Sequence, residues 1–216
     1  MFLKKINPSL LQGLEEAGLT KPTGVQKETF GTIKSGVDCV IAAPDGMGKT
    51  VTIVINVIQR LEKAFEQSPR ALVIVQDKAK VLEMEELFKQ YAKHTDLRVY
   101  GVYEQGDIDY DKNQISVGID VLIGTPGRLN NMFSSAGFDV NRLKMFILDD
   151  ANVILKARHD TKVMRMSDGI IKTQRLFFTE AITERIESLA DRIMIEPLFF
   201  EFDEHDEQEE QEEVTK

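Results

Sequence analysis

The stretch Ala42–Thr50 reads AAPDGMGKT, and it decides the fold. A short apolar run, Cys39–Ala43, precedes its glycines, and a long amphipathic stretch, residues 50–67, follows them. A strand, a glycine-containing turn and a helix in this order are typical of a loop that binds phosphate, because backbone N–H groups at the helix start attract phosphate oxygens. The residues expected to bind a nucleotide here are Ala43, Pro44, Asp45, Gly46, Met47, Gly48, Lys49 and Thr50.

Within this loop, Lys49 would neutralise the β- and γ-phosphates and Thr50 would ligate Mg²⁺. Asp45 adds a carboxylate beside the phosphates, and at about 6 Å the repulsion is on the order of 2–3 kcal/mol. Ala43 stands where the usual pattern has its first glycine. The alternative interpretation is an ordinary strand-to-helix turn with an incidental lysine.

Apolar runs rich in β-branched residues alternate with amphipathic stretches along the rest of the chain. This alternation predicts an α/β fold with a mostly parallel sheet and helices on both faces. The predicted strands are Cys39–Ala43, Ala71–Gln76, Leu97–Val102, Val121–Gly124, Lys144–Asp149, Arg175–Thr179 and Arg192–Ile195. The predicted helices are Pro8–Ala17, Thr23–Ser35, Thr50–Gln67, Lys78–Lys93, Gly127–Ser134 and Ile182–Ala190.

One of these strands ends in two acids, Asp149 and Asp150. Parallel strands collect their carboxyl ends at one edge of the sheet, so these carboxylates are expected beside the phosphate loop. Enzymes with such loops hold Mg²⁺ and the attacking water in this way. A pair of acids after a strand also commonly caps the next helix, and that alternative stays open.

Charge is concentrated at one end of the chain. The net charge is −9, but residues 201–216 carry −8 of it, which leaves the body close to neutral. We expect residues 1–200 to form one domain and residues 201–216 to be an acidic disordered tail. A neutral body has no general basic footprint for nucleic acid, so any such contact would come from a local cluster.

The sequence has no membrane-spanning run, no signal peptide and a single cysteine, which together indicate its compartment and limit its covalent chemistry. No apolar run reaches the roughly 20 residues that span a bilayer, and no signal peptide follows the N-terminal lysines, so we expect a cytoplasmic protein without membrane contact. Cys39 is the only cysteine, which excludes an internal disulfide and a cysteine-cluster metal site.

Taken together, these motifs resemble the DEAD-box RNA helicases, in particular their first RecA-like domain, from about Phe2 to Phe200. Residues 18–26, GLTKPTGVQ, resemble the Q motif within the region 1–36, which implies that Gln26 reads adenine and that ATP is the cofactor, with Mg²⁺. Phe2 would be the aromatic residue that packs near adenine. The phosphate loop matches AxTGxGKT with Asp45 in the place of the threonine.

The catalytic segments depart from the family pattern. LDDAN, Leu148–Asn152, occupies the place of the L-DEAD motif, so Asp149 keeps the Mg²⁺-associated acid and Asp150 replaces the glutamate that positions water. Asn152 replaces the last aspartate, and FTEA, residues 178–181, occupies the place of F-SAT. The resemblance therefore implies Lys49, Asp149 and Asp150 as catalytic residues, with Asn152 and Thr179 coupling ATP to RNA.

For RNA, the resemblance is strongest at an intact TPGR motif, formed by Thr125, Pro126, Gly127 and Arg128. These residues would hold the sugar-phosphate backbone of a single strand without reading its sequence. Gly101 matches the first of the paired glycines in the family, and Lys78 keeps the cation of the PTRELA segment. The alternative for TPGR is a capped helix entrance with proline in its first turn.

The function expected from this pattern is an ATP- and RNA-binding domain with weakened or lost ATPase activity and no unwinding alone, because a second RecA-like domain supplies the arginine fingers in the family. Such a domain, or a protein partner, is expected in trans. The alternative is a non-catalytic scaffold or regulatory pseudo-helicase that acts through protein partners. A small phosphate-loop kinase is a third possibility, under which the TPGR and Q-like stretches would be coincidences.

Overall fold

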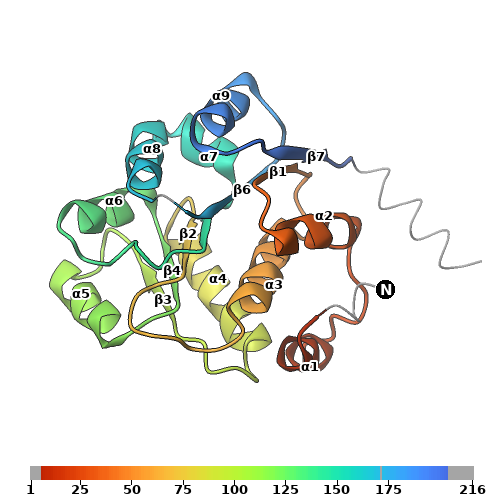
Figure 1. Cartoon of the computed structure of the whole chain (residues 1–216), viewed down its shortest axis with the longest axis horizontal. Helices are drawn as coiled ribbons and strands as arrows, with labels where there is room; N and C mark the ends of the chain where they lie inside the picture. Colours follow the sequence, from red (N-terminus) through yellow and green to blue (C-terminus); the bar gives the residue numbers. More distant parts are fainter. Residues whose placement is uncertain (1–5, 171, 204–216) are drawn as a thin grey trace, which may run out of the picture.

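A seven-stranded parallel sheet forms the centre of the computed structural model, which describes residues 6–170 and 172–203 (Figure 1). The strand order across the sheet is β3-β4-β2-β5-β6-β1-β7, and all neighbouring pairs are parallel. The strands are β1 (Cys39–Ala42), β2 (Ala71–Ile74), β3 (Val99–Val102), β4 (Val121–Gly124), β5 (Met145–Leu148), β6 (Gln174–Thr179) and β7 (Leu198–Glu201).

The central strands are short apolar runs because both of their faces are covered. CVIA in β1, ALVI in β2 and MFIL in β5 are buried at every position. A strand buried on both faces needs continuous apolar side chains rather than an alternating pattern. Successive residues therefore enter opposite layers, as Val40 and Ile41 do.

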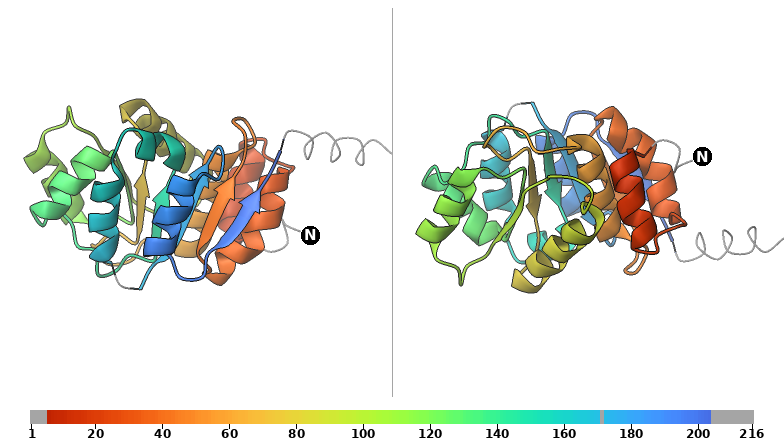
Figure 2. Two further views of the ribbon diagram at one scale, coloured as in Figure 1. Left: turned by 90° about the horizontal axis from the view of Figure 1, so that it is seen from above. Right: turned by 90° about the horizontal axis from the view of Figure 1, so that it is seen from below.

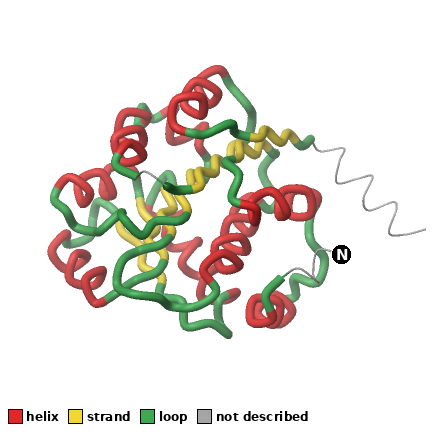
Figure 3. The backbone as a smooth tube through the Cα atoms, viewed as in Figure 1, coloured by secondary structure: helices red, strands yellow, loops and turns green. Residues whose placement is uncertain are grey.

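Helices cover the sheet in two layers, which Figures 1 and 3 show on either side of the strands. The first layer contains α1 (Pro8–Glu16), α2 (Gly24–Ser35), α3 (Lys49–Leu61) and α4 (Lys78–Tyr91). The second layer contains α5 (Ile108–Val117), α6 (Pro126–Ser134), α7 (Ala151–Lys156), α8 (Asp160–Asp168) and α9 (Glu184–Ile193). The predicted α/β class with helices on both faces is confirmed.

The loops after the strands meet at one edge of this sheet, because the strands all run in the same direction. β1 lies between β6 and β7 (Figure 2), while β5 and β2 follow on the far side of β6. The segments after β1, β5 and β6 therefore gather in one place, and those after β2, β4 and β3 gather beside them. Ligands of open parallel sheets bind at such an edge.

The last predicted strand is wrong. Residues 192–193 end helix α9, and the sheet is completed by β7 at Leu198–Glu201. Ile186, Leu189, Ala190 and Ile193 are buried at helical spacing, and Thr183 caps the helix, so Ile193 belongs to a helical stripe. Phe202 is buried as well, so the folded part extends past residue 200.

Helix α3 is shorter than predicted, and three helices were not predicted. α3 ends at Leu61 because Glu62 adopts a left-handed φ of +62°. α5, α7 and α8 are the unpredicted helices. Phe2 and most of residues 201–216 lie outside the described residues. None of the helices within the described ranges combines the length and apolar character needed to cross a bilayer.

Candidate nucleotide and RNA site

The predicted phosphate loop lies at the carboxyl end of β1 and leads directly into α3. Gly46 and Gly48 have φ angles of +89° and +84°, a left-handed region in which glycine is favoured. Gly48 is the N-cap of α3, and no side chain in the described part of the chain caps the first N–H groups of that helix. These donors can bind an anion, and the helix dipole favours negative charge at the same point.

Lys49 is buried within the loop and donates three hydrogen bonds through Nζ. The acceptors are the carbonyl oxygens of Ala43 at 2.6 Å and Pro44 at 3.1 Å, and Oδ1 of Asp45 at 3.0 Å. The side chain of Asp45 is 89% exposed. The sequence suggested that Asp45 adds an uncompensated negative charge to the loop. In the structure Asp45 instead forms an ion pair with Lys49. A phosphate group must compete with this carboxylate for the ammonium.

Gln26, predicted to read adenine, lies directly against the phosphate loop. Thr23 and Gln26 form a reciprocal capping box at the start of α2, in which Gln26 Oε1 accepts from Thr23 N at 3.1 Å. Thr23 Oγ1 donates to the carbonyl of Met47 at 3.2 Å, and Gln26 Nε2 lies 3.1 Å from where a Cβ of Gly48 would stand. The structure thus brings the Q-like segment and the loop together.

The two residues predicted to ligate Mg²⁺ also meet. Thr50 Oγ1 donates to Asp149 Oδ2 at 3.2 Å, which joins the start of α3 to the end of β5. Asp149 is fully buried, and its other oxygen, Oδ1, has no hydrogen-bond partner among the described residues. A hydroxyl and a carboxylate with an unpartnered oxygen match the hard oxygen donors that Mg²⁺ prefers.

Lys80 lies beside this pair of residues, although the sequence did not predict it as a site residue. It is the third residue of α4, and its Nζ lies 3.8 Å from Asp149 Oδ2 and 3.3 Å from Glu83 Oε2. The side chain is only 17% exposed. Its signal in the sequence is position: Lys80 lies one and two helical turns before the buried residues Met84 and Phe88, on a face that is otherwise apolar.

Burial and neighbouring charges alter the acids at the end of β5. Burial, with a further contribution from the charge of Asp150, raises the pKa of Asp149 to about 6, while Lys80 acts in the opposite direction. Burial also raises the pKa of Asp150. For Lys80, burial lowers the pKa, but the neighbouring carboxylates of Asp149, Glu83 and Asp150 together outweigh burial, so the net shift is upward. Lys80 is therefore the counter-ion of a carboxylate pair that would otherwise repel a phosphate.

The segments after β5 and β6 are linked through Asn152 and Glu180, and not through the predicted coupling residues Asn152 and Thr179. Asn152 Nδ2 donates to Glu180 Oε2 at 3.4 Å, and Glu180 N donates to Asn152 Oδ1 at 3.4 Å. Thr179 is buried, and its hydroxyl instead donates to the carbonyl of Ala181 at 3.1 Å. Glu180, which the sequence reasoning did not select, is the direct partner of Asn152.

Arg128, the predicted phosphate ligand of the TPGR motif, is buried in an ion pair. Its Nε donates to Asp111 Oδ2 at 3.0 Å, a terminal nitrogen also contacts this oxygen, and the same nitrogen donates to the carbonyl of Gly106 at 2.9 Å. Arg128 is 6% exposed and Asp111 5%. The guanidinium therefore links α5 to α6. It is buried and does not point to the surface where RNA was expected to bind.

The start of α6 is covered by an acid from the loop after β3. Glu104 Oε2 accepts a hydrogen bond of 2.7 Å from Thr125 Oγ1. A Cβ atom at Gly127 would lie 2.5 Å from Glu104 Oε1. The carboxylate thus occupies the helix N-terminus that was predicted to hold an RNA phosphate, with Pro126 in its first turn. No local pattern in the sequence predicts this contact.

The remaining predicted RNA residues have partners within the fold. Gly101 N donates to Glu85 Oε1 at 2.7 Å, and a Cβ at Gly101 would overlap Val81 and Glu85. Gly101 therefore permits α4 to pack closely on β3. The ammonium of Lys78 lies 4.6 Å from the centre of the Tyr103 ring, a cation–π contact at the edge of the same surface.

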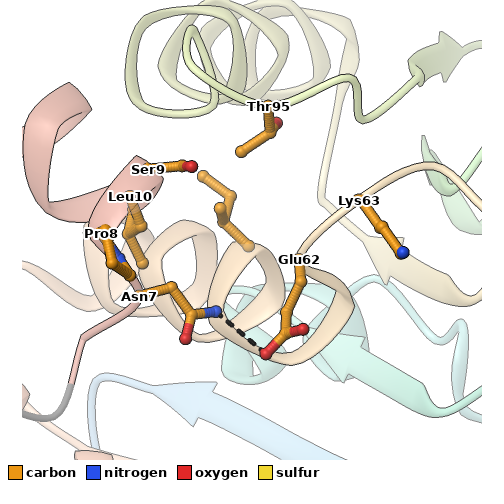
Figure 4. Close-up of a pocket in the computed structure, with 8 residues that line it drawn as sticks. Asn7, Pro8, Ser9, Leu10, Glu62, Lys63 and Thr95 are labelled. Carbon is orange, nitrogen blue, oxygen red and sulfur yellow. Dashed lines mark hydrogen bonds between the residues drawn. The ribbon is translucent and has the colours of Figure 1, made fainter.

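Two hollows lie away from these residues. One of about 310 Å³ is lined by the start of α1, the end of α3 and Thr95 (Figure 4). Another of about 590 Å³ lies at the amino ends of β1 and β6 and is lined by three cations, Arg60, Lys144 and Lys172. We locate the candidate site by the meeting of Lys49, Thr50 and Asp149, and not by the position of these hollows.

Comparison with known proteins gives a consistent result. A sequence model of the DEAD/DEAH box helicase family matches residues 23–189. The ATP-dependent RNA helicase eIF4A of Eremothecium gossypii is 26% identical over 195 residues, which cover 90% of this chain and 49% of the relative. The ATP-dependent RNA helicase DBP4 of Kluyveromyces lactis is 32% identical over 194 residues, covering 86% and 24%.

A solved structure shares the fold. The crystal structure of the yeast DEAD-box splicing factor Prp28 superposes with a TM-score of 0.84 at 21% identity, and the match covers 91% of this chain and 50% of that one. The sheet and its two helical layers therefore have the RecA-like arrangement that the sequence predicted. The chain spans half or less of the length of these relatives.

Proposed function

The chain belongs to the DEAD/DEAH box helicase family, and from this premise we propose that it is an ATP- and RNA-binding domain of the RNA-helicase type with weakened ATPase activity. The family membership supports the class of ligands, and the geometry at the edge of the sheet supports the individual residues. Strand separation would need a second RecA-like domain in addition to this one.

The observation that carries this proposal is the meeting of three segments around the phosphate loop. Lys49 and Thr50 lie at the start of α3, and Asp149 reaches Thr50 across the sheet at 3.2 Å. Gln26 lies against Gly48 from the other side. This arrangement is suited to an adenosine polyphosphate, with the adenine beside Gln26 and the phosphates at the helix N-terminus.

For the phosphates, the chain provides N–H donors of α3 and the ammonium of Lys49. Binding requires Lys49 Nζ to exchange its contact with Asp45 for a phosphate oxygen. The carbonyl contacts of Lys49 to Ala43 and Pro44 keep the ammonium in the loop during this exchange. If Mg²⁺ accompanies the nucleotide, Thr50 and Asp149 would hold it, and it would supply positive charge beside the phosphates.

Hydrolysis is weakened at the position of the general base. Asp150 is shorter than glutamate by one methylene, about 1.5 Å, whereas positioning of a water demands heavy-atom distances of about 2.6–3.2 Å. Asp150 also has a left-handed φ of +51°, so its backbone is constrained at the start of α7. A carboxylate that stops short of the water is expected to lower the rate by orders of magnitude.

RNA would bind along the loops after β2, β3 and β4, where Lys78 and the TPGR segment lie. Such contacts to the sugar-phosphate backbone are independent of sequence. Because Glu104 covers Thr125 and Gly127 while Asp111 holds Arg128, the expected affinity is low, and it should rise when Glu104 is neutralised.

A second candidate is a non-catalytic scaffold or regulatory pseudo-helicase. It is favoured by the internal pairing of the polar groups on both surfaces: Asp45 with Lys49, Glu104 with Thr125 and Asp111 with Arg128. Under this alternative the nucleotide site is retained only as part of the framework, and partners bind elsewhere.

The two candidates are separated by titration with a fluorescent adenine nucleotide, with and without single-stranded RNA. We expect saturable nucleotide binding that RNA tightens, and hydrolysis well below the usual enzyme range of about 1 s⁻¹ or more. Binding of neither ligand would favour the scaffold. An RNA-stimulated rate in the usual range would show that Asp150 is an adequate base.

A further inference from the structure

The ammonium of Lys80 lies against the carboxylate that would hold a metal ion. It is 3.8 Å from Asp149 Oδ2, the same oxygen that accepts the hydrogen bond from Thr50 Oγ1 at 3.2 Å. Glu83, one turn along α4, contacts this ammonium at 3.3 Å. A lysine that paired only with a surface glutamate would extend into solvent, but Lys80 is 17% exposed and lies over Asp149.

The charges around this point explain why a cation is needed. Asp149 is fully buried, one of its oxygens has no hydrogen-bond partner within residues 6–170 and 172–203, and Asp150 follows it directly. A polyphosphate at the phosphate loop would approach both carboxylates. Lys49 is already paired with Asp45, so the second cation near these acids is the ammonium of Lys80, which is part of the chain and always present.

The same ammonium opposes a metal ion. A divalent cation held by Asp149 would lie beside the ammonium of Lys80, which is 3.8 Å from Oδ2 of the same carboxylate, and like charges at such a distance repel. Lys80 thus lowers the affinity of Asp149 for a metal while supplying part of the positive charge that the metal would bring.

We propose that Lys80 takes the place of the divalent cation at Asp149, so that this chain binds an adenosine polyphosphate without requiring Mg²⁺. The inference rests on the proposed function, because it concerns the metal requirement of the same nucleotide site.

The test is a titration of the full chain with a fluorescent ATP analogue, in millimolar Mg²⁺ and in excess EDTA. We expect the two dissociation constants to agree within about threefold. In binding free energy, a threefold ratio is slightly less than half of a tenfold change. Binding that needs Mg²⁺ would overturn the inference and leave the proposed function intact. No binding under either condition would refute the proposed function and the inference together.

Variants of α4 assign the effect to one side chain. Lys80→Met keeps the unbranched part of the side chain and removes its charged end, so binding in EDTA should weaken roughly tenfold or more, with Mg²⁺ restoring part of the affinity. Lys80→Arg, which keeps the charge, should retain binding in EDTA. The control is Lys89→Met, which removes an exposed cation from the same helix and should bind like the wild type.

Circular dichroism and the melting temperature would show that each variant is folded. A folded Lys80→Met variant that binds in EDTA as tightly as the wild type would refute the assignment. If Lys80→Met does not fold, loss of binding in EDTA by a folded Lys80→Arg variant would refute it equally, because that variant keeps the positive charge.

Discussion

Replacing Asp45 by threonine is expected to tighten ATP binding by about 5- to 30-fold. In the structure Asp45 Oδ1 lies 3.0 Å from Lys49 Nζ. A phosphate oxygen that takes the same ammonium would stand about 3 Å beyond the nitrogen and hence about 6 Å from the carboxylate. The variant removes both a competitor for Lys49 and a like charge near the ligand.

The size of the effect follows from the exposure of Asp45. Its side chain is 89% exposed, so the ion pair with Lys49 contributes about 0–1 kcal/mol. Repulsion at about 6 Å is about 0.7 kcal/mol per unit charge in water and about 3 kcal/mol at an effective dielectric of about 20, and strong exposure favours the lower value. Together they amount to about 1–2 kcal/mol, a factor of about 5–30.

The assay is titration with a fluorescent ATP analogue at low salt, with melting temperatures measured in parallel. Stability should change little, because an exposed pair contributes little to folding. The control is Asp45→Asn, which keeps the shape of the side chain and removes its charge, and it should reproduce most of the gain. Unchanged affinity in both variants would show that Asp45 does not compete with phosphate, and the reasoning would then be wrong.

Three further predictions concern the candidate RNA surface and its supports. Arg128→Ala removes the cation that pairs with the buried Asp111 and leaves it the hydrogen bond from the hydroxyl of Tyr100, so thermal unfolding should show a loss of about 3–5 kcal/mol; wild-type stability combined with lost RNA binding would contradict the structural role of this pair. Glu104→Gln removes a carboxylate from the start of α6, so single-stranded RNA should bind about three- to tenfold more tightly at low salt, and unchanged affinity would show that this acid does not limit binding. Burial raises the pKa of Glu85 above 4.5, although the hydrogen bond from Gly101 acts in the opposite direction. The folded state therefore holds the proton of the Glu85 carboxyl more tightly than the unfolded state does. Glu85 thus makes the wild type lose stability as the pH rises above about 4.5. Glu85→Gln should lose less than the wild type between about pH 4.5 and pH 7 in parallel melts, whereas parallel curves for the two proteins would exclude the effect.

Most of the sheet could be predicted from the sequence because the core strands carry their signal locally. Continuous apolar runs such as those in β1 and β5 are buried on both faces, and no other element of this length fits them. The prediction failed at the end of the chain, where β7 has the weaker pattern LFFE and is largely exposed at its sheet edge. Apolar residues of α9 were then assigned to the missing strand.

The end of α3 illustrates a signal that is not local. Residues 62–67 include good helix formers, yet the helix stops at Leu61. Arg70 donates to the carbonyl of Leu61 at 3.2 Å and also contacts the carbonyl of Lys63, while its guanidinium pairs with Asp120 at 2.7 Å. The carbonyl oxygen of Leu61 at the helix end is thus satisfied by the side chain of the residue just before β2, which no short window of sequence would reveal.

The candidate site also combines residues that a local motif predicts with residues that only the folded structure brings near. Gln26, Lys49, Thr50 and Asp149 belong to short motifs whose spacing already implies a meeting at one edge of the sheet, and the structure brings them together. Their partners depend on which loops lie side by side in space. For that reason Lys80 escaped prediction, as did the other internal partners Glu104, Asp111 and Glu180.

The most direct test of the account is whether ATP stabilises the chain through Lys49. At a nucleotide concentration about ten times the dissociation constant, the melting temperature of the wild type should rise by about 3–6 °C. Lys49→Ala should show no such rise, whatever its own melting temperature. No rise in the wild type, or an equal rise in both proteins, would contradict the claim that an adenosine polyphosphate binds at this loop.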